Sequence, residues 1–353
     1  MEYEVKLTVY NTLGMNLQQK IRHTTSEYFE DTIHPLKLSQ ATSVYKSILN
    51  SICGEALSAE EGREDLLLDN GKPLGTLMAS YCLDDVLRTR QFIHGINDAI
   101  IDKSKTQNSI HIMYAGTGPF ATLLLPIILK PYTVDIKYTF LEINSFSFKL
   151  LKRVLSKLEL EAHDITLVNE DATTYQIDSK NEPDIIVSEA MQNALAKEQQ
   201  VPIYLNLIRQ VKYDALFIPE KIELYIGLTQ TGIPMEALQL KHYHQKTKVF
   251  EVSKTALFGS HESKTQSYAV KSFPINKTVI APEILKGYDY LVLITKIQIY
   301  KKIKIGINDS ALTTPIFVSG IPRNLQGSIT FNTQYKISSE PKLEYSIHLP
   351  GVV

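Results

Sequence analysis

The sequence predicts an α/β protein with a doubly wound parallel-sheet domain, followed by antiparallel strands in a barrel or sandwich. Two apolar runs, Ile110–Tyr114 and Tyr138–Leu141, are each followed by a helix-length segment, which is typical of buried parallel strands. A glycine turn follows the first run. After about residue 220, short alternating stretches replace this pattern. We predict a mostly helical cover at 1–72, a ligand-binding domain at 73–220 and a β domain at 221–353.

Composition indicates an ordinary globular protein. The chain has 353 residues with 44% hydrophobic content, enough to bury a sizeable core. Its net charge of −1 does not mark it as a nucleic-acid or membrane-surface binder. Cys53 and Cys82 lack metal-site spacing, and no signal peptide or membrane-spanning stretch is visible. We expect a cytoplasmic protein with free thiols and no metal, nucleic-acid or membrane partner.

The first 72 residues carry no candidate chemistry. Val5–Tyr10 alternates like a short strand, whereas Leu36–Leu57 has a helical period that ends near Gly54. We expect this segment to cover the ligand-binding face of the following domain.

A long helix is predicted from Leu74 to Lys103, because apolar positions recur there at steps of three and four. Asp85 and Arg88 interrupt its apolar stripe. They are explained either by a salt bridge on a solvated face, or by Arg88 pairing with the carboxylate of a bound ligand.

The stretch from Asn108 to Glu142 has the order strand, glycine turn, helix, strand and acid. Gly116 and Gly118 allow backbone amides to approach a ligand, and Thr122–Leu129 is predicted to continue as a helix. Glu142 follows the second strand, where an acid accepts hydrogen bonds from the two hydroxyls of a ribose.

A third strand, Ile165–Val168, leads to Asp171 and Ala172, which suit contact with an adenine amino group. The third glycine of a dinucleotide site is missing, because position 121 is alanine. One ribose, one adenine and no phosphate loop indicate S-adenosylmethionine. The alternative is that the turn from Ala115 to Pro119 only links a strand to a helix in another α/β protein.

The fourth strand, Pro183–Val187, runs into a loop with two acids, Glu189 and Glu198, nine positions apart. A loop that leaves the carboxyl end of a sheet strand lies over the ligand crevice, so we expect both carboxylates to face the methyl group. Considered singly, each acid is better explained as an ordinary exposed residue of a helical loop.

Alternating stretches dominate the C-terminal part, with a partly helical insertion, Pro234–Leu240, after the first of them. The predicted strands are Ile222–Gly227, Tyr290–Thr295, Lys302–Ile307, Gly327–Asn332 and Leu343–His348.

The turn and the acids after the second and third strands resemble S-adenosylmethionine-dependent methyltransferases with a Rossmann-like domain built on a seven-stranded sheet, over roughly residues 75 to 220. Leu83–Thr89 resembles the helix of protein arginine methyltransferases that carries the carboxylate-binding arginine, here Arg88. The cofactor-binding residues implied so far are Arg88, Ala115, Gly116, Gly118, Glu142, Asp171 and Ala172.

The loop Ser188–Glu198 resembles the double-glutamate loop of the same family, with a methionine two places after the first glutamate. The resemblance makes Glu189 and Glu198 the catalytic pair and adds Glu189 to the cofactor-binding residues. It also implies a β-barrel second domain with a dimerisation insertion near 229–250, and hence a homodimer.

Two departures from the family concern the acceptor cleft. Ala190 stands where the family usually has tryptophan, and the chain contains no tryptophan. The best counterpart of the family's threonine-histidine-tryptophan loop, Leu312–Pro315, lacks both the histidine and the tryptophan. The altered cleft favours free arginine or another small guanidine compound as readily as a protein.

A guanidine acceptor explains the need for two carboxylates. A guanidinium stays protonated at neutral pH, and its delocalised charge leaves little lone-pair density on nitrogen. Two glutamates bind its N–H groups and draw the charge away from the attacking nitrogen, so that transfer needs positioning and no metal.

Three hypotheses remain from the sequence. The first is an arginine-type N-methyltransferase, and the second is a natural-product N- or O-methyltransferase with another acceptor. The third is a catalytically silent binding module of the same fold. Intact Gly116, Gly118, Glu142 and Glu189 argue against the third hypothesis, because a silent copy is expected to have no need for them.

Overall fold

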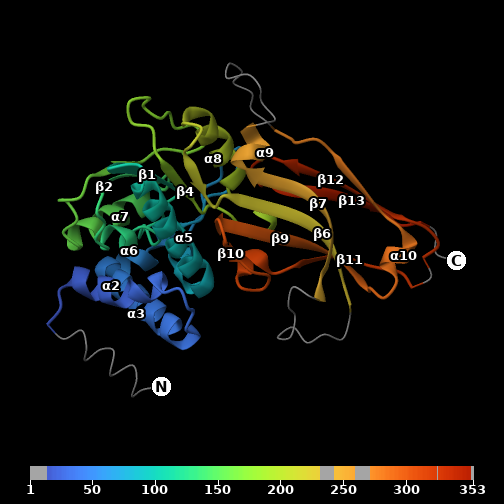
Figure 1. Ribbon diagram of the computed structural model, residues 1–353, viewed down its shortest axis with the longest axis horizontal. Helices are drawn as coiled ribbons and strands as arrows, with labels where there is room; N and C mark the ends of the chain where they lie inside the picture. The colour runs from blue at the N-terminus through green and yellow to red at the C-terminus, as the bar shows by residue number, and fades with distance from the viewer. Residues whose placement is uncertain (1–13, 231–241, 259–270, 324, 351–353) are drawn as a thin grey trace. The chain divides into compact units, whose positions relative to one another are not determined.

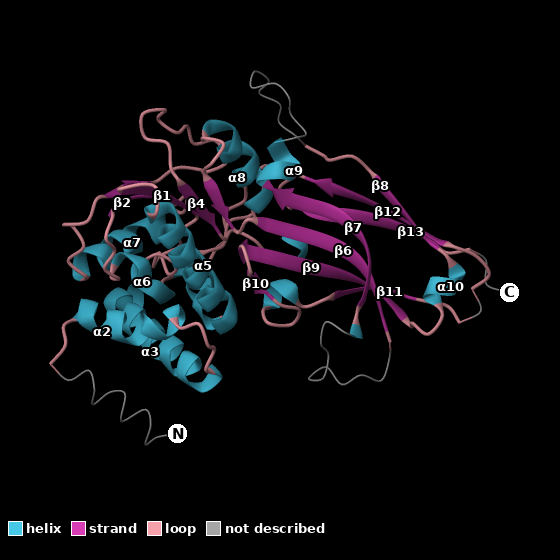
Figure 2. Cartoon of the chain, viewed as in Figure 1, coloured by secondary structure: helices cyan, strands magenta, loops and turns pink. Residues whose placement is uncertain are grey.

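A computed structural model describes residues 14–230, 242–258, 271–323 and 325–350. The chain divides into two compact units. The parallel-sheet unit comprises Met1–Leu66, Leu74–Ser188 and Gln210–Ile218, and the antiparallel unit comprises Leu67–Pro73, Glu189–Arg209 and Pro219–Val353. Most long helices belong to the first unit and most strands to the second (Figures 1 and 2). The division at residues 72 and 220 remains a prediction.

Five parallel strands form the sheet of the first unit in the part of the chain that the structure describes, in the order β3-β2-β1-β4-β5 (Figure 1). The continuous apolar run of β1 is buried from Ile110 onward, as expected for a parallel sheet covered on both faces. The four predicted strands are confirmed as β1 (Ser109–Ala115), β2 (Asp135–Leu141), β3 (Ile165–Val168) and β4 (Ile185–Ser188). The fifth strand, β5 (Leu216–Ile218), was not predicted.

The two longest helices described in this unit have 19 residues each. The predicted N-terminal helix is confirmed as α3, which starts with Pro35 and ends before Gly54, whose φ of 59° is the left-handed geometry that stops helices. The helices are α2 (Leu17–Thr25), α3 (Pro35–Cys53), α4 (Thr76–Tyr81), α5 (Val86–Ser104), α6 (Leu125–Ile128) and α7 (Ser145–Lys157).

The prediction of one helix from Leu74 to Lys103 is wrong. Helix α4 gives way to a 3₁₀ turn at Cys82–Asp84, and α5 starts after Asp85. The Asp85 carboxylate accepts a hydrogen bond from the backbone N–H of Arg88 at 3.3 Å, which makes Asp85 an N-cap. Asp is among the strongest N-cap residues, so the local backbone bond overrides the helical period.

The predicted helix Thr122–Leu129 is also too long. Only the four residues of α6 are helical, and turns precede them. Ala121 has a φ of 47°, a left-handed conformation that interrupts a helix, and Pro126 lies in the first turn of α6.

The antiparallel unit contains two sheets, β10-β9-β6-β7 with β11 paired to β9, and β13-β12-β8. No strand ladder joins them among the described residues, so the structure shows two sheets and no closed barrel. Phe250 of one sheet stacks on Tyr335 of the other, with ring centroids 4.3 Å apart. The strands are β6 (Lys221–Thr229), β7 (His244–Ser253), β8 (Asn276–Ile280), β9 (Tyr290–Tyr300), β10 (Ile303–Ile305), β11 (Ile316–Gly320), β12 (Ile329–Lys336) and β13 (Lys342–His348).

All five predicted strands of this unit are found, but β7, β8 and β11 were missed. The unit also holds α8 (Gln200–Leu207), α9 (Lys254–Phe258) and α10 (Pro282–Leu285). The predicted strand Val5–Tyr10 and helix Pro234–Leu240 lie outside the described residues, as does part of the predicted insertion. Cys53 and Cys82 are not joined by a disulfide. No helix in the described ranges has both the length and the apolar character needed to cross a bilayer.

Candidate functional site

The glycine turn follows β1 at the carboxyl edge of the parallel sheet. Gly116 and Gly118 have φ angles of 82° and 61°, the left-handed region that glycine adopts without strain. The backbone N–H of Gly116 donates to the carbonyl oxygen of Leu141 at 2.9 Å, which ties the turn to the end of β2. Ala79 of α4 lies next to Gly118, where an added Cβ would meet its methyl group at 3.7 Å. The turn is therefore held between β2 and α4.

Glu142 lies directly behind this turn and is only 5% exposed. Its Oε2 accepts hydrogen bonds from the backbone N–H of Gly118 at 2.7 Å and from the Thr117 hydroxyl at 3.4 Å. Its Oε1 accepts one from the backbone N–H of Asn144 at 2.8 Å. These donors take up most of the roughly four acceptor positions of a carboxylate.

Burial raises the pKa of Glu142 to about 7, although hydrogen bonds from the backbone of Asn144 and Gly118 act in the opposite direction. Desolvation disfavours the charged form more than these donors stabilise it. The Glu142 side chain therefore changes charge near neutral pH.

Glu142 has a structural role that the sequence did not reveal. Because it links the glycine turn to the start of α7, a silent copy of the fold also needs this residue. An intact Glu142 therefore does not argue against a binding module.

Asp171 follows β3 at the same edge of the sheet. Its Oδ1 accepts a hydrogen bond from the backbone N–H of Thr173 at 2.8 Å, and no described residue bonds to its Oδ2. Ala172 beside it is buried. The sheet thus brings Asp171 and Ala172 to the same edge as the glycine turn, with one carboxylate oxygen still available.

Asn169 and Asn144 position this edge, and neither was predicted as a site residue. The Asn169 amide donates to the carbonyl oxygen of Glu142 at 2.6 Å, which joins the ends of β2 and β3. Asn144 is the N-cap of α7 and accepts from the backbone N–H groups of Phe146 and Ser147. An asparagine before an amphipathic helix is a recognisable N-cap signal, so Asn144 was detectable from the sequence.

Arg88 lies in the first turn of α5 and is only 8% exposed. Its Nη2 donates to the carbonyl oxygen of Cys82 at 2.7 Å. The guanidinium is therefore not on a solvated face, and the break between α4 and α5 provides part of its surroundings. Its predicted contact with the ligand carboxylate remains a prediction.

The glutamate loop, residues 189–200, belongs to the antiparallel unit, and a hydrogen bond joins its two ends. The side-chain oxygen of Gln200, a residue with 1% exposure, accepts a hydrogen bond from the backbone N–H of Ala190 at 2.9 Å. Glu189 and Glu198 thus come from the two ends of one closed loop. Glu198 is buried at 7% exposure and Glu189 is half-buried, so the interpretation as exposed acids is wrong.

Asn193 anchors the tip of the loop to the strands of its own unit. Its Oδ1 accepts a hydrogen bond from the Thr295 hydroxyl at 2.9 Å, and its Nδ2 donates to the carbonyl oxygen of Thr314 at 2.6 Å. Thr314 belongs to the loop Leu312–Pro315, which therefore contacts the glutamate loop directly. These bonds hold a segment in which Ala194 has a left-handed φ of 57°.

A buried tyrosine supports the same segment. The Tyr335 hydroxyl donates to the carbonyl oxygen of Leu195 at 2.6 Å, and Leu195 also has a left-handed φ of 57°. Non-glycine residues pay a steric cost in this region, so several anchors are needed to maintain it. Side-chain bonds from Asn193 and Tyr335 therefore fix the glutamate loop to the strands of its own unit.

No protein-family model and no curated protein matches the sequence. Solved structures do match it. The crystal structure of PRMT6 is 12% identical and aligns with a TM-score of 0.51 over 76% of this chain and 98% of that chain. The chain has the fold of PRMT6. In this chain the fold joins a parallel-sheet unit to a β-rich second unit.

Two further solved structures are less similar. The Trypanosoma brucei PRMT1 enzyme-prozyme complex with AdoHcy is 12% identical, with a TM-score of 0.48 over 76% of this chain and 92% of that one. Arabidopsis thaliana protein arginine methyltransferase 10 is 11% identical, with a TM-score of 0.47 over 77% and 98%.

Proposed function

We propose that this protein transfers a methyl group from S-adenosylmethionine to a guanidine nitrogen of free arginine or another small guanidine compound. The observation that carries the proposal is the register of the parallel sheet. Ser188, the last residue of β4, pairs with Ala115, the last residue before the glycine turn. Glu189 is the next residue along the chain, and the Gln200 bond closes the loop that returns to Glu198.

The residues at the sheet edge fit a nucleoside. The left-handed glycine turn presents backbone without a Cβ, and the Asp171 Oδ2 is available to accept from an adenine amino group. The Thr117 hydroxyl forms a long hydrogen bond to the Glu142 carboxylate. A bound ribose has to displace this bond before Glu142 accepts hydrogen bonds from both ribose hydroxyls. Arg88 is proposed to hold the carboxylate of the cofactor. When bound, the cofactor supplies an electrophilic methyl group.

Glu189 and Glu198 are proposed to bind the guanidinium through its N–H groups. Two carboxylates held in one closed loop present acceptors in a fixed arrangement, which matches the planar donors of a guanidinium. They polarise the cation so that one terminal nitrogen keeps more lone-pair density, and they orient that nitrogen for in-line attack. The proton left on the nitrogen passes to a glutamate or to water.

A small acceptor is supported by the composition of the loop. Ala190 occupies the place where the resemblance has a tryptophan, and removal of an indole widens an acceptor pocket. Formation of a homodimer remains a proposal that rests on the predicted insertion near 229–250.

The test incubates the purified chain with methyl-labelled S-adenosylmethionine and, separately, arginine, agmatine or an arginine-rich peptide, followed by mass spectrometry. Methylarginine or methylagmatine is the expected product. Glu189→Gln and Glu198→Gln should each lower the rate at least about a hundredfold while cofactor affinity is retained. Glu340→Gln, an exposed acid of the same unit, is the matched control. An oxygen-methylated product with other acceptors, and no guanidine methylation, would contradict the proposal.

A second candidate is a binding module that does not methylate. The observation that favours it is the near saturation of Glu142 by donors of its own chain. Isothermal titration calorimetry with S-adenosylmethionine separates the two candidates, because the methyltransferase binds it and the module does not.

A further inference from the structure

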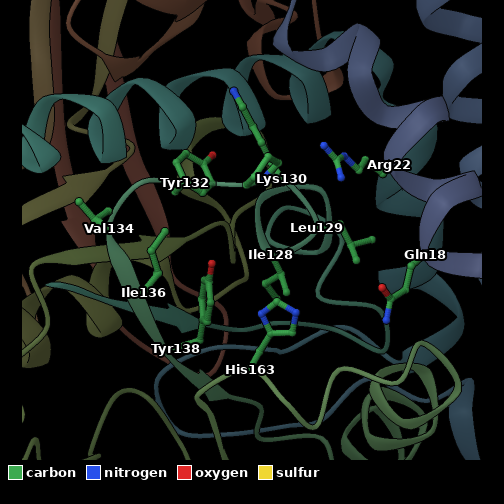
Figure 3. A pocket seen from close by; sticks show the side chains of 11 residues that line it. Gln18, Arg22, Ile128, Leu129, Lys130, Tyr132, Val134, Ile136, Tyr138 and His163 are labelled. Carbon is green, nitrogen blue, oxygen red and sulfur yellow. The ribbon is translucent and has the colours of Figure 1, made fainter. Parts of the chain in front are cut away.

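A cavity of about 310 Å³ lies between α2 and the N-terminal half of β2 in the parallel-sheet unit (Figure 3). Ile136 and Tyr138 of β2 form one wall, and the segment that follows α6 forms another. Arg22 and Gln18 of α2 reach it from the opposite side. Its volume is at the lower end of the roughly 300–1,000 Å³ of small-molecule sites.

Tyr138 is the most informative residue of this cavity. It is 3% exposed, and its hydroxyl bonds to no described residue. Figure 3 shows the hydroxyl directed into the cavity, between Ile136 and Ile128. Because this hydroxyl has no partner among the described residues, it is able to donate a hydrogen bond to a polar group of a ligand in the cavity.

The described side chains that line the cavity include basic residues and no acidic ones. None of the described residues that line the cavity is acidic, whereas Arg22, Lys130 and His163 do line it. Figure 3 shows the Arg22 guanidinium pointing toward the cavity, and Arg22 forms no ion pair with a described residue. A guanidinium that pairs with no described residue, in the same cavity as an unbonded hydroxyl, is suited to a carboxylate.

Lys130 is already engaged elsewhere. Its Nζ donates to the Asn97 side-chain oxygen at 2.5 Å and lies 4.3 Å from the centroid of the Phe29 ring. Only its aliphatic stem is left for the cavity, next to Tyr132 and Ile136. Among the described lining residues, Arg22 on α2 is therefore the strong cation that has no ion-pair partner, and Ile128, Ile136 and the ring of Tyr132 supply apolar surface.

We propose that this cavity binds a singly charged organic acid with an aromatic or branched apolar body. The carboxylate pairs with Arg22 and accepts a hydrogen bond from the Tyr138 hydroxyl. The apolar body packs between Ile128, Ile136 and Tyr132.

This site is distinct from the cofactor edge. Ile136 and Tyr138 lie on β2 before its carboxyl end, where Glu142 follows Leu141. They share one face of the strand, because alternate residues point to the same side. The proposal therefore stands whether or not the protein methylates a guanidine.

The experiment titrates the full chain with 3-phenylpropanoate by calorimetry, with the uncharged 3-phenylpropanamide and inorganic phosphate as matched probes. Saturable binding of the acid with a dissociation constant of roughly 1 mM or tighter is expected. The amide should bind at least about tenfold more weakly, because it cannot form the charged pair. Phosphate should not compete, since it lacks an apolar body.

Three variants locate the site. Arg22→Gln should weaken binding of 3-phenylpropanoate about tenfold, and Tyr138→Phe about threefold to tenfold. Lys20→Gln removes the same charge from the same helix without lining the cavity and should change nothing. The thermal midpoint of each variant without ligand reports on folding. No saturable binding of the acid, equal binding of the amide, or an unchanged affinity of the folded Arg22→Gln variant would overturn the proposal.

Discussion

The side chain of Gln200 bonds to the backbone N–H of Ala190 at 2.9 Å, ten residues earlier in the chain. This contact joins the residue after Glu189 to the start of α8. The separation of the two glutamates is thus fixed by a neutral residue that carries none of the proposed chemistry.

Replacement of Gln200 by methionine, which is similar in shape, removes the acceptor and leaves the Ala190 N–H unsatisfied. We expect a loss of about 1–3 kcal/mol in the free energy of unfolding, measured with urea. Guanidine methylation should fall more than cofactor affinity. Gln192→Met on the same loop is the control, because its side chain bonds to no described residue. Equal effects of the two substitutions would refute the proposed closure.

Cofactor affinity should increase with pH. The pKa of Glu142 is raised to about 7 by burial, and only its ionised form accepts from both hydroxyls of a ribose. Between pH 6 and pH 8 the ionised fraction rises about tenfold, so the affinity for S-adenosylmethionine should rise by a similar factor. Calorimetry at several pH values checks this. Glu142→Gln should bind weakly with no such dependence, whereas Glu340→Gln should keep it.

The free energy of unfolding without ligand should decrease as the pH rises, in contrast to the cofactor affinity. The folded protein holds a proton on Glu142 up to pH about 7, while the unfolded chain releases it near 4.5. This group therefore contributes stability that is present below pH 4.5 and is lost as the pH rises through 7. The loss is on the order of 3 kcal/mol. Urea unfolding from pH 5 to pH 8 should show a flatter profile for Glu142→Gln, and parallel profiles would contradict the assignment.

Gly118 is required for its backbone geometry. An added Cβ meets no atom closer than the Ala79 methyl group at 3.7 Å, so Gly118→Ala introduces no clash. Its φ of 61° nevertheless costs an alanine about 1–2 kcal/mol, which thermal or urea unfolding will measure. Gly118→Asn should cost less, because asparagine tolerates this region. Gly320→Ala, with open space and no left-handed φ, should change stability by less than about 0.5 kcal/mol.

Much of the parallel sheet could be predicted from the sequence, because buried parallel strands are continuous apolar runs. The break between α4 and α5 could not, since Asp85 fits a helical period and acts through a backbone bond that only coordinates reveal. Strand β7 was missed because its first five residues are not buried and show no alternation. Strand β11 at the edge is partly exposed throughout, so its pattern is equally weak.

The candidate site, like the fold, could be predicted only in part from the sequence. Residue types and spacing selected Gly118, Glu142, Glu189 and Glu198. The sequence did not reveal that Glu142 serves its own turn, because a carboxylate's donors depend on the path of the backbone. Asn193 was missed for a similar reason, since its partners Thr295 and Thr314 are about a hundred residues away.

The polypeptide passes between the two units at residues 66–67, 73–74, 188–189, 209–210 and 218–219. Strand β5, which completes the parallel sheet next to β4, is therefore synthesised only after the whole glutamate loop. A ribosome must translate past Ile218 before the sheet has all five members. Neither unit can therefore be exchanged with that of another protein as one uninterrupted segment.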